Sequence, residues 1–423
     1  MGVRRILAAV FGLASLAGCG EPENAKRPLP QEAYVWQRAW TPAVGGAVRS
    51  EAGSFAGLHL LAAEVAWTGE NPVVSRPDLP LDTLSGLSVP VSPVLRLGPF
   101  DGTFDRGDPT TRFLCDLAVS VVEEWRAAGV RPAELQVDFD AATARLADYR
   151  SWVEALREAV APTPLTITAL PTWLPHPAFP ALARATDGYV LQVHSFRRPS
   201  SVREIPPLCD PEEARRSVRS ANRIGVPFRV ALPTYGYALF FDGAGNFTRL
   251  AAEGFPPESL AAAPATVVRL AADPDEMAGL VREWTRKPPG NLAGLLWFRL
   301  PTPEDHWNWP IETLRAVRQG RSPESRLEVR AEKGENGLIR ILVENQGETE
   351  ETLPATVGTR LSPTHLLAGD GSNGYVWSDS DPLSLTRRHP SPTLRPAESR
   401  TIAWLRLTDD TNPHPILVHD LVP

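Results

Sequence analysis

Two aspartates and a glutamine occupy alternate positions in a short apolar run, residues 135–140. Side chains of a β-strand alternate with a period of two, so Gln136, Asp138 and Asp140 would all point to one face. Carboxylates on an interior strand are costly unless water, a ligand or a partner group meets them. The pair could serve acid–base chemistry, hold a ligand, or be bonded to arginine or to backbone donors, and the sequence leaves these alternatives open.

Eight short runs of nearly continuous apolar character could supply the scaffold, as is typical of strands buried on both faces. We predict strands at residues 34–40, 57–67, 91–97, 135–140, 165–170, 188–194, 228–233 and 292–300. Helical spacing falls between the later ones, at residues 112–128, 145–160, 179–185, 210–224, 274–286 and 310–318. This alternation predicts an α/β fold, a (β/α)8 TIM-like barrel over residues 33–320 with an insertion at about 238–272.

Two features limit the barrel prediction. The first two connections show no clear helix, and the 43 prolines of the chain favour loops over long helices. A doubly wound open sheet is the alternative, although no glycine-rich phosphate fingerprint follows any strand. After residue 320 the helical period disappears, and runs at residues 326–330, 338–344, 352–360 and 401–407 predict a small all-β sandwich over 326–423. This module would pack on the barrel or bind a glycan or a partner.

The N-terminus is typical of a targeting segment. Arg4 and Arg5 precede an apolar run too short to span a bilayer, which predicts a signal peptide over residues 1–18. Residues 16–19 resemble the bacterial lipobox, which implies cleavage before Cys19, lipidation there and a polar tether over residues 19–32. The alternative is a plain signal peptide with a chance cysteine. By analogy with enteric sorting rules, the residue after Cys19 favours the periplasmic face of the outer membrane in the cell envelope.

Composition restricts the classes of partner. The formal net charge is −7 and there is no basic tract, which argues against nucleic-acid binding. Cys115 and Cys209 could form a disulfide or remain buried free thiols. No cluster of histidine, cysteine and glutamate has metal-ligand spacing, and no nucleophile elbow is present, so we expect neither a metal nor a cofactor. Nothing in the sequence indicates the oligomeric state.

Polar and aromatic residues cluster at the predicted carboxyl ends of the strands, where barrels bind ligands. The candidate catalytic carboxylates are Asp140, Asp138 and Glu64, and the alternative for Glu64 is a salt-bridged barrel acid. The candidate ligand-binding residues are Trp36, Gln37, Arg38, Gln136, Gln192, His194, Tyr235, Trp297 and Arg299. Aromatic faces stack on sugar rings while amides and charged groups bond hydroxyls, so this mixture favours a glycan or oligosaccharide ligand.

Three of these segments resemble the family-18 glycoside hydrolases, the chitinase group. Residues 228–237 resemble that group's seventh strand, residues 294–297 resemble its eighth, and Asp138-Phe139-Asp140 resembles its Asp-x-Asp signature. The resemblance implies a barrel acting on glycans, with Trp297 as the floor of the sugar site and Asp140 as the partner of an acetamido group. The chain departs from it at Ala142, where the group needs a glutamate as general acid, and at His194, where the group has tyrosine.

The chain resembles still more closely a bacterial lipoprotein family of unknown function, domain-of-unknown-function family 3142. The segments that carry this resemblance are residues 34–37, 136–140, 191–194 and 297–301, and it implies no known activity. Loss of a general acid removes a factor of roughly 10²–10⁴ in rate. Three hypotheses therefore remain: a glycoside hydrolase with Glu64 as a relocated acid, a lipoprotein that binds glycans without catalysis, and an envelope scaffold that uses its β-module.

Overall fold

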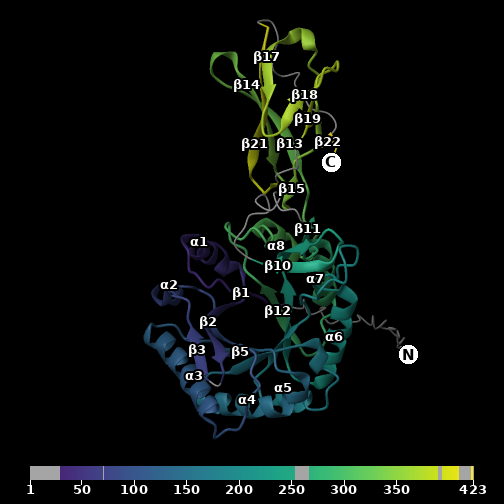
Figure 1. Ribbon diagram of the computed structural model, residues 1–423. Helices are drawn as coiled ribbons and strands as arrows, with labels where there is room; N and C mark the ends of the chain where they lie inside the picture. Colours follow the sequence, from purple (N-terminus) through teal and green to yellow (C-terminus); the bar gives the residue numbers. More distant parts are fainter. Residues whose placement is uncertain (1–28, 70, 253–265, 389–392, 409–420, 423) are drawn as a thin grey trace, which may run out of the picture.

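The computed structural model describes residues 29–69, 71–252, 266–388, 393–408 and 421–422 (Figure 1). The predictions for the signal peptide, for Cys19 and for most of the tether fall on residues 1–28, which lie outside the described residues. Within the described part, the chain folds into a barrel followed by an elongated β-module.

Eight parallel strands form the barrel within the described residues, and the first strand pairs with both the second and the last, which closes it. These strands are β1 (Gln31–Val35), β2 (Leu58–Thr68), β4 (Val91–Leu97), β5 (Leu135–Phe139), β6 (Leu165–Ala169), β7 (Tyr189–Gln192), β8 (Phe228–Pro233) and β12 (Leu292–Phe298). The predicted fold class is therefore confirmed, and the open doubly wound sheet is excluded because an open sheet has no pairing between its first and last strands.

Helices surround the barrel as the spacing predicted (Figure 1). They are α3 (Pro109–Ala127), α4 (Leu146–Val160), α5 (Phe179–Arg184), α6 (Pro211–Ile224), α7 (Pro274–Arg286) and α8 (Ile311–Arg318). The expectation that the first two connections lack helices is wrong, because α1 (Pro42–Glu51) and the short α2 (Leu81–Ser85) occupy them. Two adjacent glycines weaken the helical signal of α1, whereas Thr41 caps its first turn and Pro42 occupies its first position.

The first strand lies earlier in the chain than predicted. It begins at Gln31 and ends at Val35, in register with β12 on one side and β2 on the other. Trp36, Gln37 and Arg38 therefore follow the strand and lie in the loop at its carboxyl end. β1 ends at Val35 because its pairing ends there: residues 31–33 pair with β12 and residues 33–35 pair with β2.

An additional strand and a separate sheet extend from the barrel. β2 extends beyond the residues that pair with β4, and its last residues pair antiparallel with β3 (Asn71–Ser75). The predicted insertion contains an antiparallel sheet of β9 (Gly236–Phe241), β10 (Phe247–Ala251) and β11 (Thr266–Ala271).

The C-terminal module contains antiparallel sheets around its own apolar core, which confirms the predicted β-sandwich. One sheet has β13 (Leu327–Lys333), β14 (Ile339–Asn345), β21 (Ser399–Leu407) and β17 (Leu366–Gly371). The other has β18 (Tyr375–Trp377), β19 (Ser384–Arg387), β16 (Thr356–Gly358) and β22 (Leu421–Val422), while β15 (Glu351–Thr352) pairs with β20 (Thr393–Leu394). Arg395 donates hydrogen bonds to the carbonyls of Pro303, Asp305 and Asn308, in the loop after β12. The module is thus attached at the end of the barrel where the strands terminate (Figure 1).

Candidate functional site

The inside of the barrel has an apolar middle and a polar group at each end. Tyr34, Leu61, Val94, Val190 and Leu296 form part of the interior apolar cluster. The inward-facing residues before and after this layer on several strands are charged or polar, because the period of two keeps alternate residues on one face. The two ends differ in exposure, and we describe them in turn.

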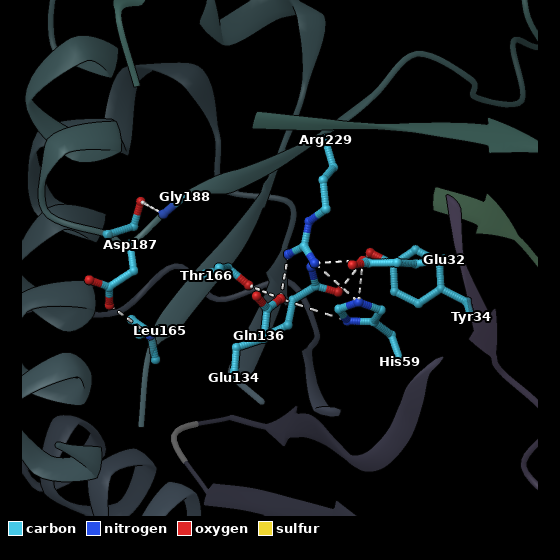
Figure 2. Close-up of polar contacts among 11 residues, drawn as sticks. Glu32, Tyr34, His59, Glu134, Gln136, Leu165, Thr166, Asp187, Gly188 and Arg229 are labelled. Atoms are coloured by element: carbon cyan, nitrogen blue, oxygen red, sulfur yellow. Dashed lines mark hydrogen bonds and ion pairs between the residues drawn. The ribbon is translucent and has the colours of Figure 1, made fainter. Parts of the chain in front are cut away.

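At the amino end of the strands, one arginine lies between two glutamates (Figure 2). Arg229 of β8 forms ion pairs with Glu32 at 2.7 Å and with Glu134. His59 lies 2.8 Å from Glu32 through Nε2, and Thr166 donates to Glu134 at 2.7 Å. Each of the four ionisable side chains is less than one-fifth exposed. We call this group the closed network.

The closed network shifts the pKa of its acid on β1. Burial alone would raise the pKa of Glu32, but the hydrogen bond from His59 and the charges of His59 and Arg229 outweigh it and lower the pKa from 4.5 to about 2. The Tyr34 hydroxyl donates to Gln136 Oε1 at 2.7 Å, one step further along the barrel. Buried charges that pair with one another favour a stabilising role for this end, because ligands of such barrels bind at the carboxyl ends of the strands.

At the carboxyl end, Arg96 of β4 binds both aspartates of the predicted site. It donates to Asp138 at 2.8 Å through Nη1 and to Asp140 at 2.8 Å through Nη2. Asp138 is 8% exposed and also accepts from Thr168 at 2.7 Å, whereas Asp140 is 45% exposed. Burial, and then the charge of Asp140, raises the pKa of Asp138 despite the ion pair with Arg96. Gln136 and Asp138 therefore share the inner face, as the alternation predicted.

A β-bulge in β2 places Glu64 opposite Arg96. Leu61 of β2 pairs with Val94, and a register shift then places Glu64, rather than Ala63, opposite Arg96. Because Val94 and Arg96 share the inner face of β4, Glu64 lies on the inner face of β2. Its two carboxylate oxygens accept from Arg38 at 2.5 and 2.8 Å. We call Arg38, Glu64, Arg96, Asp138 and Asp140 the open row.

The open row has no carboxyl group two residues after Asp140. Ala142 stands there, at the start of a single 3-10 turn that leads into α4. The neighbouring Ala141 carbonyl accepts from the Trp173 indole at 3.2 Å, which fixes the loop against the outside of the barrel. Both oxygens of Glu64 and one oxygen of each aspartate accept from arginine. The other Asp138 oxygen accepts from Thr168, which leaves the second oxygen of Asp140 for a further donor.

Aromatic side chains collect beside the open row. Phe298 of β12 lies 5.3 Å from Trp36 and 5.6 Å from both His194 and Tyr235, measured between ring centroids. His194 Nδ1 lies 3.2 Å from the Tyr235 hydroxyl. Burial lowers the pKa of His194 from 6.5 to about 3, so the ring is neutral at ordinary pH. Three predicted site residues, Trp36, His194 and Tyr235, are thus brought together, and Phe298 is an additional one.

Two predicted residues do not contribute in the expected way. Trp297 is fully buried between barrel and helices, where its indole donates to Gln31 at 2.9 Å and packs against Trp309. Its ring has no face open to a ligand, which contradicts its expected place as the floor of a sugar site. Arg299 is 11% exposed and its guanidinium binds Asp305 at 2.7 Å, which ties the end of β12 to the loop that carries the module.

Several buried polar atoms lack a hydrogen-bond partner among the described residues, and three belong to predicted site residues. They are Gln37 Oε1, Gln136 Nε2 and His194 Nε2. Gln37 Nε2 donates to the Leu300 carbonyl at 3.2 Å, and Gln192 Nε2 donates to the His194 carbonyl at 3.2 Å. A buried unpaired polar atom costs about 1–3 kcal/mol, so these atoms are suited to hydrogen bonds with water or with ligand hydroxyls.

A cavity of about 490 Å³ lies beside the ends of β6 and β7, next to the start of α6. Gln192 and His194 are among its lining residues, together with Thr172, Ser195 and Arg197. This volume falls in the range of small-molecule sites, roughly 300–1,000 Å³. The cavity therefore adjoins the aromatic group on the side of β7.

The described part of the chain contains neither a candidate metal site nor a disulfide. No three histidine, cysteine, aspartate or glutamate side chains there could hold a metal ion. Cys115 and Cys209 are both free thiols, and burial raises the pKa of Cys209 to about 12. Among the helices that the structure describes, none has the length and apolar character needed to cross a membrane.

Arg96 and the closed network were missed at the sequence level. The signal was present as a charged residue in or beside an apolar run, such as Glu32 two residues before Tyr34, or Arg229 within residues 228–233. His59 is 2% exposed, and its ring lies between Glu32 and Glu134 of this network.

Two family models match different parts of the chain. A family model described as domain of unknown function (DUF3142) matches residues 90–303, which confirms the resemblance to that family. A second model, described as domain of unknown function (DUF8456), matches residues 328–408. No curated protein matches the chain.

Solved structures similar to this chain include three bacterial enzymes. A chitinase from Chromobacterium violaceum is 17% identical, with a TM-score of 0.43 over 69% of this chain and 98% of that one. The spore cortex-lytic enzyme SleL of Bacillus cereus is 11% identical, with a TM-score of 0.49 over 71% and 76%. A glycoside hydrolase family 18 N-acetylglucosaminidase from Paenibacillus barengoltzii is 14% identical, with a TM-score of 0.44 over 69% and 99%.

Proposed function

For this chain, which belongs to the family described as domain of unknown function DUF3142, we propose that the carboxyl end of the barrel binds a glycan without hydrolysing it. One observation carries the proposal: Arg96 binds both Asp138 and Asp140, while Ala142 occupies the place of the general acid. Glycoside hydrolysis needs a protonated group at the leaving oxygen. The carboxyl groups of the open row are paired with arginine instead.

The groups around the open row suit sugar hydroxyls. Asp140 is half exposed and keeps one carboxylate oxygen outside its bond to Arg96. Gln37 Oε1 and His194 Nε2 are available as additional hydrogen-bonding atoms. The partly buried ring of Phe298, beside Trp36 and Tyr235, adds an apolar surface of the kind that packs against a pyranose face.

A second candidate function is hydrolysis with Glu64 as the acid. The β-bulge that turns Glu64 onto the inner face, in register with Arg96, favours this alternative. It requires that the ligand displace Arg38, because both oxygens of Glu64 accept hydrogen bonds from that guanidinium. The separation between Glu64 and Asp140 in a complex would then decide the hydrolytic geometry.

We also propose that the chain is a lipoprotein of the cell envelope, anchored through Cys19 and placed on the periplasmic face of the outer membrane. The support is the lipobox-like segment at residues 16–19. Metabolic labelling with a radioactive fatty acid tests this part. Label on the wild-type chain and none on Cys19→Ser supports the anchor, and equal labelling of both overturns it.

The binding proposal is tested with the full chain, purified in mild detergent and incubated with amino-sugar polymers and exopolysaccharides. We expect binding without release of reducing ends, and a loss of affinity of about tenfold or more in Arg96→Met. Arg106→Met is the matched control, because Arg106 forms an exposed ion pair with Glu158, and neither residue belongs to the open row. Absence of binding to every polymer overturns the proposal. Release of reducing ends that Glu64→Gln abolishes replaces it with the hydrolase.

A further inference from the structure

A second cavity continues the first along α6. It has a volume of about 320 Å³ and shares three lining residues, Pro171, Arg216 and Ser217, with the 490 Å³ cavity beside β7. The two cavities together form a groove between the loop after β6 and helix α6, which we call the α6 groove. Its lining runs from Asp210, at the start of α6, to Ile224, at its end. At 1.5 Å per residue this length is about 20 Å.

One side of α6 lines the groove with arginine and serine. Arg216, Ser220 and Arg223 are spaced at four and three residues, so they lie along the same helix face. The opposite face, with Ala214, Val218 and Ala221, is buried against the barrel. The groove therefore has a continuous polar wall that the packing of the helix does not use.

The acids of the groove are already engaged. Asp210 caps α6 by accepting from the amides of Glu212 and Glu213 at 2.8 and 2.9 Å. Glu213 binds Arg197 at 3.2 Å. Arg216, by contrast, has no ion-pair partner within the described residues, and Arg223 donates only to the Ser220 hydroxyl, at 2.9 Å. Two exposed guanidinium groups therefore remain free for a ligand in a chain whose net charge is −7.

The opposite wall of the groove is apolar. Pro171, Leu174 and Pro175 come from the loop after β6, and Ile224 closes the far end. The apolar wall can pack against sugar rings, and the serine and arginine side chains of the other wall can bond sugar hydroxyls and anionic substituents. Arginine forms paired, charge-assisted hydrogen bonds with carboxylate, sulfate and phosphate oxygens.

We propose that the α6 groove binds the anionic substituents of an acidic glycan whose chain extends from the open end of the barrel. This inference rests on the proposed function, because the groove begins at Gln192 and His194, beside the aromatic group of the barrel. It names the ligand as a polysaccharide that bears carboxylate or ester-linked anionic groups. Arg216 and Arg223 are the residues that select it.

The test uses two matched pairs of polymers and the full chain. Polygalacturonate is compared with its methyl ester, and dextran sulfate is compared with dextran. We expect the anionic member of at least one pair to bind about tenfold or more tightly than its neutral counterpart, with the difference shrinking at high salt. Selectivity within either pair supports the proposal, and the pair that shows it identifies the anionic group.

Three variants distinguish binding in the α6 groove from nonspecific attraction by the positive charge of the helix. Arg216→Ser is expected to reduce the selectivity several-fold, and Arg216→Ser with Arg223→Ser to remove it. Arg219→Ser is the matched control, because Arg219 is exposed on the same helix but lines neither cavity. Equal effects of Arg216→Ser and Arg219→Ser overturn the inference.

Two outcomes distinguish this inference from the function on which it rests. If all four polymers bind with equal affinity and Arg96→Met weakens them alike, the barrel end binds glycans and the groove inference is overturned. If selectivity depends on Arg216 while Arg96→Met changes nothing, the groove is supported as an anion site, and the binding role of the barrel end is overturned.

Discussion

The two ends of the barrel interior use the same arrangement in different surroundings. At the amino end, Arg229 lies between Glu32 and Glu134, and at the carboxyl end Arg96 lies between Asp138 and Asp140. Each group places one cation between two acids, with a threonine hydroxyl donating to one of them. Each ionisable side chain of the closed network is less than one-fifth exposed, whereas Asp140 in the open row is 45% exposed.

Because the two groups differ in exposure, we expect one to contribute mainly to stability and the other mainly to ligand binding. A buried arginine between buried acids satisfies charges that would otherwise be isolated, and its loss leaves them uncompensated. An arginine at an open end holds its acids in place while one of them still faces solvent. The closed network should therefore control the free energy of unfolding, and the open row should control affinity for the ligand.

Arg229→Met is expected to have the largest effect on stability. It leaves Glu32 and Glu134 buried without their cation, which costs about 3–5 kcal/mol of unfolding free energy. Chemical denaturation followed by tryptophan fluorescence measures this loss. The triple variant with Glu32→Gln and Glu134→Gln removes the stranded charges and should recover most of it. A loss below about 1 kcal/mol in Arg229→Met would contradict the distinction between the two ends.

The acid dependence of stability should come partly from Glu32. Its pKa is lowered from 4.5 to about 2 in the folded state, so the unfolded chain binds the extra proton first as the pH falls. The wild-type chain should lose roughly 3 kcal/mol between pH 4.5 and pH 2, through this group alone. Denaturation curves of wild type and Glu32→Gln, recorded from pH 6 down to pH 2, should differ most at pH 6 and converge near pH 2.

Asp138 should change the free energy of unfolding with pH in the direction opposite to Glu32, so it serves as a control. Its pKa is raised in the folded state, so its charged form is less favoured than in the unfolded chain, and its contribution to stability falls as the pH rises above 3.8. Asp138→Asn compared with wild type should therefore change with pH in the direction opposite to Glu32→Gln. The same direction for both variants would mean that the two ends are electrostatically alike.

Arg96→Met should affect binding more than stability. Asp138 loses its cation but keeps Thr168, and Asp140 can turn to solvent, so we expect a cost of about 2 kcal/mol. Glycan affinity should fall by about tenfold or more, because both aspartates lose their fixed positions. Calorimetric titration and denaturation of the same sample measure the two effects. A stability loss equal to that of Arg229→Met, with affinity unchanged, would reverse the roles of the two ends.

The sequence was sufficient to predict the scaffold and one strand of the site. Eight apolar runs with helices between them indicate a barrel, because strands buried on both faces are apolar throughout. The period of two correctly placed Gln136 and Asp138 together on the inner face. These predictions depend only on local pattern, and the structure confirms them.

The remaining features depend on pairing between distant segments. Arg96 meets Asp138 because β4 and β5 pair in a register that no local pattern specifies. Glu64 faces inward because of a bulge earlier in β2. Trp297 faces outward and Phe298 inward, but the run 292–300 is apolar at both parities, so its sequence cannot distinguish them. The free arginines of α6 acquire a role only through the loop after β6 that forms the other wall.

Arg38→Ala should have the smallest effect on stability and the most specific consequence for chemistry. Arg38 is 58% exposed, and exposed ion pairs contribute only about 0–1 kcal/mol. The change nevertheless frees both oxygens of Glu64, which is 21% exposed and lies on the inner face beside Arg96. If the pair only restrains the loop after β1, reducing ends stay absent and glycan affinity changes little. If Arg38 is what keeps a relocated acid from acting, hydrolysis appears in Arg38→Ala and disappears again in Arg38→Ala with Glu64→Gln. Measuring reducing ends in these two variants therefore decides whether the open row differs from a hydrolase by Ala142 alone or by its arginines as well.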